Sequence, residues 1–566
     1  MLDSNLIKIF EESFRKNSDS PALTDYFKKE TLTYFDVAQD IAKLHLVFKH
    51  AGIKQGDKIA LIGRNNTRWC VSYLATVTYG AVIVPILQDF NPNDVINIVN
   101  HSESKMLFLG DNFWDDIEAE QIPDIQAVFS LTDFHVIYER EGNTITDFIT
   151  NINVHFAAAY PQGFTLEDIK YPEVSNDKLC LLNYTSGTTG SSKGVMLSVN
   201  NLTGNIVYAI SMTNPKSGDK YFRASGRTLS FLPLAHAFGC AFDFLTPIAC
   251  GGHVTLLGRI PSPKILIEAM KNVRPTVVCS VPMILEKVYR KSILPMLEKT
   301  PMSIAMRIPL INTAIYSTIL SRLMEQFGGC VELFIVGGAA LNKETEDFLR
   351  KIKFPLTVGY GMTECAPLIS FEVPTEFKPS SCGRVVPGML EAKILSSDPQ
   401  NIPGELLIRG EHVMMGYYKN ESATTAVLEK DGWLHTGDMC TIDADNTLYI
   451  RGRCKTMILS GSGQNIYPEE IEERLNNLYM VAESLIIENN GKLTALVVPD
   501  YDLANAERID MERLPEIMEE NLKTLNTLVA SYEKVANIVI HREEFVKTPK
   551  RSIKRYLYSA ERLNLS

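Results

Sequence analysis

A loop rich in glycine and hydroxyl side chains at residues 184–195 constrains the chain more than any other stretch. It follows a short apolar run at 179–182 that predicts a strand, and it contains three glycines, six serines and threonines and one lysine. Such a loop cannot build a core. Its glycines let the backbone approach an anion, its N–H and hydroxyl groups donate hydrogen bonds, and its lysine adds positive charge. The sequence therefore predicts a binding site for a triphosphate.

The spacing of this loop differs from that of the common phosphate-binding loop, which needs glycine, four residues and then Gly-Lys-Ser/Thr. Here Lys193 is followed by Gly194, and no glycine directly precedes the lysine. This argues against the fold class that carries the common loop. A solvated linker is the alternative interpretation, but an ordered Tyr-Thr-Ser-Gly-Thr-Thr-Gly string ending in Lys-Gly-Val is not typical of linkers.

Length, charge and cysteine content limit the classes of protein that fit. A chain of 566 residues is too long for one hydrophobic core, so two or more domains are expected. The net charge of -11 argues against a nucleic-acid partner. The ten cysteines form no CxxC pair, which predicts a reduced, cytosolic protein without structural zinc. No stretch reaches the ~20 apolar residues of a spanning helix, so any membrane contact is expected to be peripheral.

Strand and helix patterns alternate along the first 90 residues. Apolar spacing and caps predict helices at 5–17, 35–52 and 67–80, and strands at 31–34, 57–62 and 81–86. Strands that alternate with helices indicate an α/β fold with parallel pairing.

A second motif lies at residues 358–364, where a predicted strand ends in Gly-Tyr-Gly and is followed by a hydroxyl and a carboxylate, Thr363 and Glu364. Upstream, the strand pattern at 331–336 runs into small residues at 337–341, against which a flat base could lie. Further motifs occur at 431–438 and 448–453, in a region that predicts a small β subdomain.

Together and in this order, these motifs resemble those of the acyl-adenylate-forming superfamily, which includes acyl-CoA synthetases, luciferases and the adenylation domains of peptide synthetases. The family usually has proline where this chain has Ser192. The resemblance implies an α/β fold with a large N-terminal domain of stacked α/β subdomains plus a small β subdomain, and a small mobile α+β C-terminal domain. We expect the first domain at 1–454 and the second at 455–566.

The resemblance also implies roles for single residues. Tyr360 would stack on adenine, Thr363 would contact phosphate and Glu364 would bind Mg²⁺, which suits an ion that prefers few carboxylates plus phosphate oxygens and water. Asp438 would hold the ribose hydroxyls, a task suited to an acceptor-only group, and Arg453 would contact ribose or phosphate. The complete predicted nucleotide site comprises Thr185, Ser186, Gly187, Thr188, Thr189, Gly190, Lys193, Gly338, Ala339, Tyr360, Gly361, Thr363, Asp438 and Arg453.

Other implied roles concern the acid and the thiol. His236, in a Leu-Pro-Leu-Ala-His segment, would lie beside the carboxylate and acyl pocket together with Phe238; taken alone, it would be a packed or capping histidine. Lys455 falls at the position of the interdomain hinge. The glycine loop with Gly461, Ser462 and Gly463 resembles the segment that lines the CoA tunnel.

The tail departs from the family pattern Thr-x-x-Gly-Lys-Ile-x-Arg. This chain has Arg551 and Ser552 where the family has the glycine and the catalytic lysine. Lys550 and Lys554 lie two residues away on either side. Three interpretations stay open. A neighbouring lysine takes the place of the family lysine, with Lys554 preferred; or adenylation proceeds more slowly without any such lysine; or the activity is impaired.

Residues 285–327 are longer than in small family members and interleave basic with apolar side chains. Solvated helices that cap a subdomain are the favoured interpretation. A basic amphipathic surface that meets anionic lipid is the sharper one. An insertion here resembles the long-chain branch of acyl-CoA synthetases.

The sequence thus predicts a cytoplasmic, ATP-dependent acyl-CoA synthetase for medium- or long-chain fatty acids, with ATP, Mg²⁺ and CoA as cofactors and co-substrates. One alternative is an acyl-AMP or acyl-carrier-protein ligase. The other is a catalytically impaired homologue that binds acyl groups or nucleotides, for which Ser552 is the discriminating residue.

Overall fold

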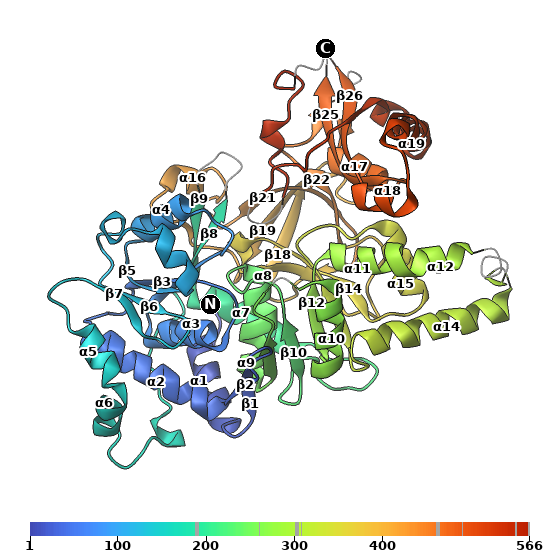
Figure 1. Ribbon diagram of the computed structural model, residues 1–566. Coiled ribbons are helices and arrows are strands. Elements are labelled where there is room, and N and C mark those ends of the chain that lie inside the picture. The colour runs from blue at the N-terminus through green and yellow to red at the C-terminus, as the bar shows by residue number, and fades with distance from the viewer. Residues whose placement is uncertain are drawn as a thin grey trace. The chain divides into compact units, whose positions relative to one another are not determined.

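The computed structural model describes residues 1–186, 192–259, 261–299, 305–306, 308–459, 464–489, 491–548 and 552–563 (Figure 1). The chain divides into two compact units. The first contains Met1–Thr185, Ser192–Glu391 and Ile408–Leu434, and the second includes Ala392–Leu407 and His435–Ser566. The domain boundary expected between residues 454 and 455 stays a prediction.

The first unit contains an eight-stranded sheet in the order β20-β9-β8-β4-β3-β5-β6-β7. Strands β8, β4, β3, β5 and β6 pair in parallel, while β7 and β20 pair antiparallel at the two edges. The strand bounds are β3 Lys58–Ile62, β4 Val82–Ile86, β5 Ser104–Leu109, β6 Ala127–Ser130, β7 Val136–Glu139, β8 Leu179–Ser186, β9 Ser192–Ser198 and β20 Gly416–Tyr417.

Helices connect these strands as the sequence pattern predicts. Helix α2 begins at a capping box in which Thr33 and Asp36 exchange hydrogen bonds, and α3 ends at Gly80, whose φ of 82° is a left-handed conformation that glycine adopts readily. The bounds are α1 Leu6–Lys16, α2 Tyr34–His50, α3 Thr67–Tyr79, α4 Pro92–Ser102, α5 Ile145–Thr150, α6 Ile152–Ala159, α7 Val199–Ser211 and α16 Glu421–Thr425.

A second sheet of the first unit has seven strands in the order β14-β13-β12-β10-β11-β1-β2, all parallel except the β1–β2 pair. A small sheet β15-β16-β17 follows it in sequence. The bounds are β1 Pro21–Asp25, β2 Glu30–Thr33, β10 Arg227–Ser230, β11 His253–Leu256, β12 Val277–Ser280, β13 Leu333–Val336, β14 Leu356–Val358, β15 Tyr360–Gly361, β16 Leu368–Phe371 and β17 Arg384–Val385.

The parallel strands of this sheet place several predicted site residues at one edge. His236 follows β10, Gly338 follows β13 and Tyr360 follows β14. Since the carboxyl ends of parallel strands meet at the same edge, and ligands of α/β sheets bind there, this edge is where a site is expected.

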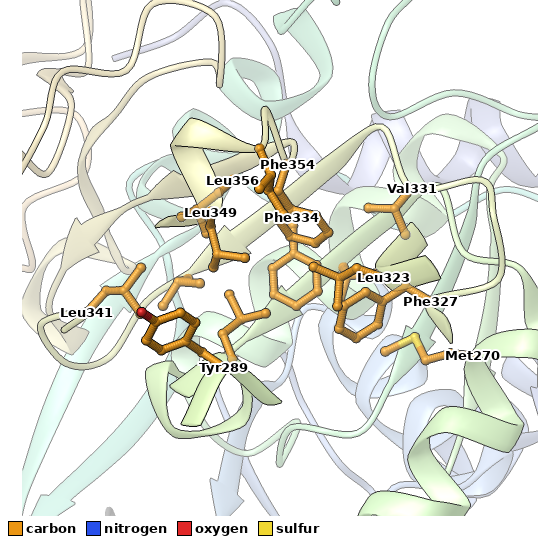
Figure 2. Close-up of a cluster of buried hydrophobic side chains, with 14 of the residues drawn as sticks. Met270, Tyr289, Leu323, Phe327, Val331, Phe334, Leu341, Leu349, Phe354 and Leu356 are labelled. Carbon is orange, nitrogen blue, oxygen red and sulfur yellow. The ribbon is translucent and has the colours of Figure 1, made fainter. Parts of the chain in front are cut away.

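Residues 285–327 pack on this sheet through Leu285, Tyr289 and Ile293 and through the second half of α14 (Figure 2). Leu323 and Phe327 join Phe334 and Phe354 in one buried cluster, so this part of the segment caps a core, whereas Ile311 in the first half is 43% exposed. Contact with lipid is untested and stays a prediction. The bounds are α8 Ala237–Gly239, α9 Thr246–Cys250, α10 Pro263–Val273, α11 Pro282–Val288, α12 Leu294–Glu298, α14 Pro309–Gln326 and α15 Lys343–Lys351.

The second unit contains most of a four-stranded sheet, β18-β19-β21-β22, a strand pair β23-β24 and a three-stranded sheet β25-β26-β27. Helices α17 and α19 bury their apolar faces in a core with β25 and β26. The bounds are β18 Leu390–Leu395, β19 Gly404–Gly410, β21 Leu434–Ile442, β22 Leu448–Arg453, β23 Ile458–Leu459, β24 Asn465–Ile466, β25 Val481–Asn489, β26 Lys492–Pro499, β27 Val535–Ile540, α17 Pro468–Asn476, α18 Tyr501–Glu507 and α19 Leu514–Leu528.

The predicted mixed α/β fold is confirmed, with a larger N-terminal part and a smaller C-terminal part. Across the described residues, none of the helices combines the length and the apolar character needed to cross a bilayer.

Candidate functional site

The predicted phosphate loop connects β8 and β9, which are neighbours in the eight-stranded sheet. Thr185 lies near the end of β8, and Lys193 lies near the start of β9. The structure therefore brings the two ends of the loop together. The central residues Gly187, Thr188, Thr189 and Gly190 lie outside the described residues, as does the side chain of Ser186.

A polar network holds the strand that leads into this loop. The hydroxyl of Tyr184 and Nδ1 of His101 form a 2.7 Å hydrogen bond. Burial lowers the pKa of His101, with a further contribution from Lys419. Glu103 lies just beyond α4, the helix that contains His101. It accepts hydrogen bonds from Lys419 and Tyr418, and these lower its pKa to about 2. The hydrogen bond between Tyr184 and His101 thus ties the end of β8 to α4.

Tyr417 on β20 connects two of the predicted site residues. Its hydroxyl donates a 2.9 Å hydrogen bond to Oε1 of Glu364, and the ammonium of Lys193 lies 5.0 Å from the centre of its ring. Glu364 belongs to a short 3₁₀ turn, Thr363–Cys365, and its carbonyl accepts a hydrogen bond from the N–H of Met414. A cation and a carboxylate of the predicted site thus belong to one cluster.

Sequence reasoning missed Tyr417. It lies 53 residues beyond Glu364 in the chain, and the two-residue strand around it is too short to give a periodic pattern. The pairing of β20 with β9, in which Tyr417 lies opposite Val195, creates the contact. The only local signal is the glycine followed by two tyrosines at 416–418.

The carboxyl edge of the seven-stranded sheet carries the predicted adenine-side residues. Gly338 has a φ of 85° in the loop after β13, and Ala339 beside it is exposed. Gly361 must lack a side chain, because a Cβ there would lie 2.1 Å from the carbonyl oxygen of Pro367. Tyr360 and Gly361 form the strand β15, which pairs with β16.

His236 begins the helical segment that follows β10. Its Nδ1 accepts a hydrogen bond from the N–H of Phe238, so the ring caps this segment as the plainer interpretation of the sequence predicted. The ring of Phe238 packs against Gly337 at the end of β13, where an added Cβ would meet it at 3.3 Å. Phe242 follows, with its ring centre 6.0 Å from that of Phe238.

A buried carboxyl group lies on the same segment and was also missed. Asp243 belongs to the π-helical turn η4, Cys240–Leu245, and is 0% exposed. Among the residues that the structure describes, neither of its oxygens has a hydrogen-bond partner of good geometry, although the thiol of Cys279 interacts with it. Burial raises the pKa of Asp243 well above its usual range, which favours the protonated carboxyl group in the fold.

The second unit brings together Asp438 and Arg453, which lie opposite each other on β21 and β22. The Arg453 Nε lies 3.1 Å from Oδ1 of Asp438, and the side chains are 66% and 6% exposed, respectively. Two predicted nucleotide contacts therefore adjoin. Lys455 follows in a turn, next to Thr456, whose hydroxyl donates a 2.7 Å hydrogen bond to Glu469. Gly461, Ser462 and Gly463 lie outside the described residues.

The tail folds back on itself around the departure from the family pattern. Thr548 and Ser552 are joined by a backbone hydrogen bond, and Lys554 donates its N–H to the carbonyl of Val546. Lys550 lies outside the described residues. Lys554 forms no ion pair with any residue that the structure describes, whereas Lys547 pairs with Glu483 at 2.5 Å.

Arg555 pairs with two glutamates of α17, Glu469 and Glu472. Burial raises the pKa of Glu472 to about 7, against the opposing charge of Arg555. These ion pairs fix the tail to α17 immediately after Lys554.

Comparison with known proteins adds independent findings. A family model described as AMP-binding enzyme matches residues 10–418. The chain is 27% identical over 573 residues to a long-chain-fatty-acid–CoA ligase of Escherichia coli O157:H7, covering 96% of this chain and 92% of the relative. It is 28% identical over 490 residues to a 4-coumarate–CoA ligase of Vanilla planifolia, covering 84% and 80%.

Solved structures share the fold. The anthranilate CoA ligase AuaEII in complex with anthranoyl-AMP superposes with a TM-score of 0.75 at 20% identity, covering 98% of this chain and 96% of that one. ATP-bound MatB from Rhodopseudomonas palustris has a TM-score of 0.75 at 22% identity, covering 98% of both chains.

Proposed function

The chain belongs to the AMP-binding enzyme family, and from this premise we propose that it is an ATP-dependent acyl-CoA synthetase for medium- or long-chain fatty acids. The names of the relatives agree on ligation to CoA and differ in the acid. The observation that carries the proposal is the contact of Tyr417 with both Lys193 and Glu364, since a cation and a carboxylate held in one cluster suit a metal-bound polyphosphate.

The proposed reaction has two halves. First, a carboxylate oxygen of the acid bonds to the α-phosphorus of ATP, and the bond to pyrophosphate breaks, which gives acyl-AMP. Second, the thiolate sulfur of CoA bonds to the acyl carbonyl carbon, and the bond to AMP breaks. The chain supplies positioning and charge stabilisation and no covalent nucleophile.

Each residue is assigned a part of the nucleotide by its chemistry. Lys193 and the phosphate loop would bind the phosphates, Thr363 would donate to one of them, and Tyr360 would stack on adenine. Asp438 would accept hydrogen bonds from ribose. Its ion pair with Arg453 supports this role, because the pair orients the carboxylate before the nucleotide arrives.

The donor set fits Mg²⁺. The described residues contain no group of three or more histidine, cysteine or acidic side chains that could enclose a metal ion. A single carboxylate, that of Glu364, completed by phosphate oxygens and water, is the arrangement that Mg²⁺ prefers. When bound, Mg²⁺ would supply positive charge to the phosphates of ATP.

Lys554 is the proposed replacement for the family lysine at Ser552. It lies immediately before Arg555, which α17 holds in place through Glu469 and Glu472. Among the described residues, no ion-pair partner has to be displaced from its amine before it reaches a phosphate. Lys550 is the second candidate.

His236, Phe238 and Phe242 would line the entrance of the acyl site. The ring of Phe238 adjoins the end of β13 and the ring of Phe242 lies next to it, so that the two offer an apolar wall. Each methylene group that such a wall buries contributes ~0.8 kcal/mol, so a deep apolar site would discriminate by chain length.

The acceptor and the products decide between this proposal and its alternatives. We would incubate the purified chain with MgATP, an equimolar mixture of fatty acids and either CoA or a phosphopantetheinylated carrier protein, and identify products by mass spectrometry. Acyl-CoA of medium or long chain length is expected. Acyl-carrier protein without acyl-CoA would identify a carrier-protein ligase, and ATP binding without any adenylate would identify the impaired homologue that Ser552 suggests.

A further inference from the structure

We propose that Tyr417 is a positioning residue that sets the metal-binding carboxylate of Glu364 and the phosphate-binding amine of Lys193 in register before ATP binds. The inference rests on the proposed function and extends it to a residue outside the predicted motifs. It is drawn from three contacts within the first unit: a strand pairing, a hydrogen bond and a cation–π contact.

The strand pairing fixes where Tyr417 can point. In the β20–β9 pair, Tyr417 lies opposite Val195 and Gly416 lies opposite Met196. Lys193 is two residues before Val195, so it lies on the same face of β9 and diagonally across from Tyr417. The backbone N–H of Tyr417 donates a 2.9 Å hydrogen bond to the hydroxyl of Thr424, which holds the strand from the side away from β9.

The hydroxyl group of Tyr417 orients the carboxylate. It donates to Oε1 of Glu364 at 2.9 Å, and the N–H of Met414 secures the carbonyl of the same glutamate. Oε2 of Glu364 makes no hydrogen bond to the described residues. One oxygen is thereby occupied by a neutral donor and the other is left to a cation, so the carboxylate does not have to rotate when the ion arrives.

The ring of Tyr417 holds the lysine. The Lys193 ammonium lies 5.0 Å from the ring centre, a distance at which the negative face of the ring attracts a cation. The same side chain therefore contacts the amine through its ring and the carboxylate of Glu364 through its hydroxyl.

Tyrosine suits this place better than another donor would. Tyr417 is 8% exposed, and its hydroxyl is placed 2.9 Å from Oε1 of Glu364, where it acts as the donor. Phenylalanine would retain the ring and lose the hydrogen bond, which allows the two contacts to be tested separately.

The experiment measures ATP binding by equilibrium dialysis at a series of Mg²⁺ concentrations, with the full chain and without acid or CoA. For Tyr417→Phe we expect the Mg²⁺ concentration at half-maximal binding to rise about tenfold, the usual cost of losing a hydrogen bond to a charged group. Tyr289→Phe is the matched control, because that hydroxyl donates a 3.0 Å hydrogen bond to Glu344 instead, and its curve should overlay that of the wild type.

The ring is tested by comparing Tyr417→Leu with Tyr417→Phe at saturating Mg²⁺. With Lys193 present, we expect Tyr417→Leu to bind ATP more weakly than Tyr417→Phe. When each is combined with Lys193→Gln, the two variants should bind ATP equally. If the wild type binds MgATP and the Tyr417→Phe curve is equal to that of the wild type, the inference is overturned and the proposed function stays intact. A wild type that binds no ATP at any Mg²⁺ concentration would overturn both.

Discussion

At the scale of single residues, the tail separates the proposed synthetase from its impaired alternative. Lys554 supplies an amine next to an arginine that two glutamates hold. If this amine stabilises the charge that develops on the α-phosphate, Lys554→Ala should lower the rate of adenylation by roughly 10²–10³. The measurement is single-turnover formation of acyl-AMP.

Lys547→Ala is the control for this prediction. Lys547 is already paired with Glu483, so its substitution should leave the rate of adenylation unchanged. Equal rates for the wild type and for both Lys554→Ala and Lys550→Ala would show that neither lysine replaces the one missing at Ser552.

Asp243 gives a pH-dependent prediction. Burial raises its pKa above the unfolded value of ~3.9, so between these two pKa values the folded chain holds a proton that the unfolded chain has released. The contribution of this group to stability is therefore greatest below about pH 4 and is lost as the pH rises, by about 1.4 kcal/mol per unit.

Asn at this position cannot ionise. The stability of Asp243→Asn relative to wild type should therefore increase from pH 4 to pH 7, as followed by urea unfolding midpoints. A stability difference that does not vary with pH would mean that Asp243 is ionised in the fold.

At the scale of elements, helix α14 tests whether residues 285–327 act as a cap. Leu323 is buried in the cluster of Figure 2, together with Phe327 and Phe334. Leu323→Ala should lower the free energy of unfolding by about 2–5 kcal/mol, because it leaves a cavity. Ile311→Ala, at a position 43% exposed, should change it by less than about 0.5 kcal/mol.

The same pair of variants addresses the lipid-facing interpretation. If α14 serves only as a cap, sedimentation with anionic vesicles will be the same for Ile311→Ala and wild type. A loss of vesicle binding in Ile311→Ala without a loss of stability would favour a lipid surface instead.

How far the sequence predicts the structure depends on the distance over which a pattern acts. Helix α2 and strand β4 follow from local spacing and caps, and the motif at 358–364 correctly marks a strand end and a turn. Tyr417 and Asp243 could not be found in this way. Their importance comes from contacts across the fold, to Glu364 and Cys279, that a single sequence does not encode as a local pattern.

At the scale of the whole molecule, we propose that the C-terminal domain rotates about Lys455 between the two half-reactions. Proline fixes φ, so Lys455→Pro should restrict the rotation. We expect adenylation to change little and thioester formation to fall at least about tenfold, since the conformational step gates the second half-reaction.

Lys455→Ala is the matched control, because it removes the amine and leaves φ free. Separate assays of acyl-AMP and of acyl-CoA formation distinguish the steps. Equal losses in both half-reactions for the proline variant would argue against a hinge at this residue.

The central claim is that the chain joins fatty acids to CoA through an adenylate. The most direct test is pyrophosphate release by the wild-type chain with MgATP and a ladder of fatty acids, with and without CoA. We predict release that requires a fatty acid, peaks at one medium or long chain length and becomes multiple-turnover when CoA is present. Absence of release with every acid, from protein that binds MgATP, would contradict the claim.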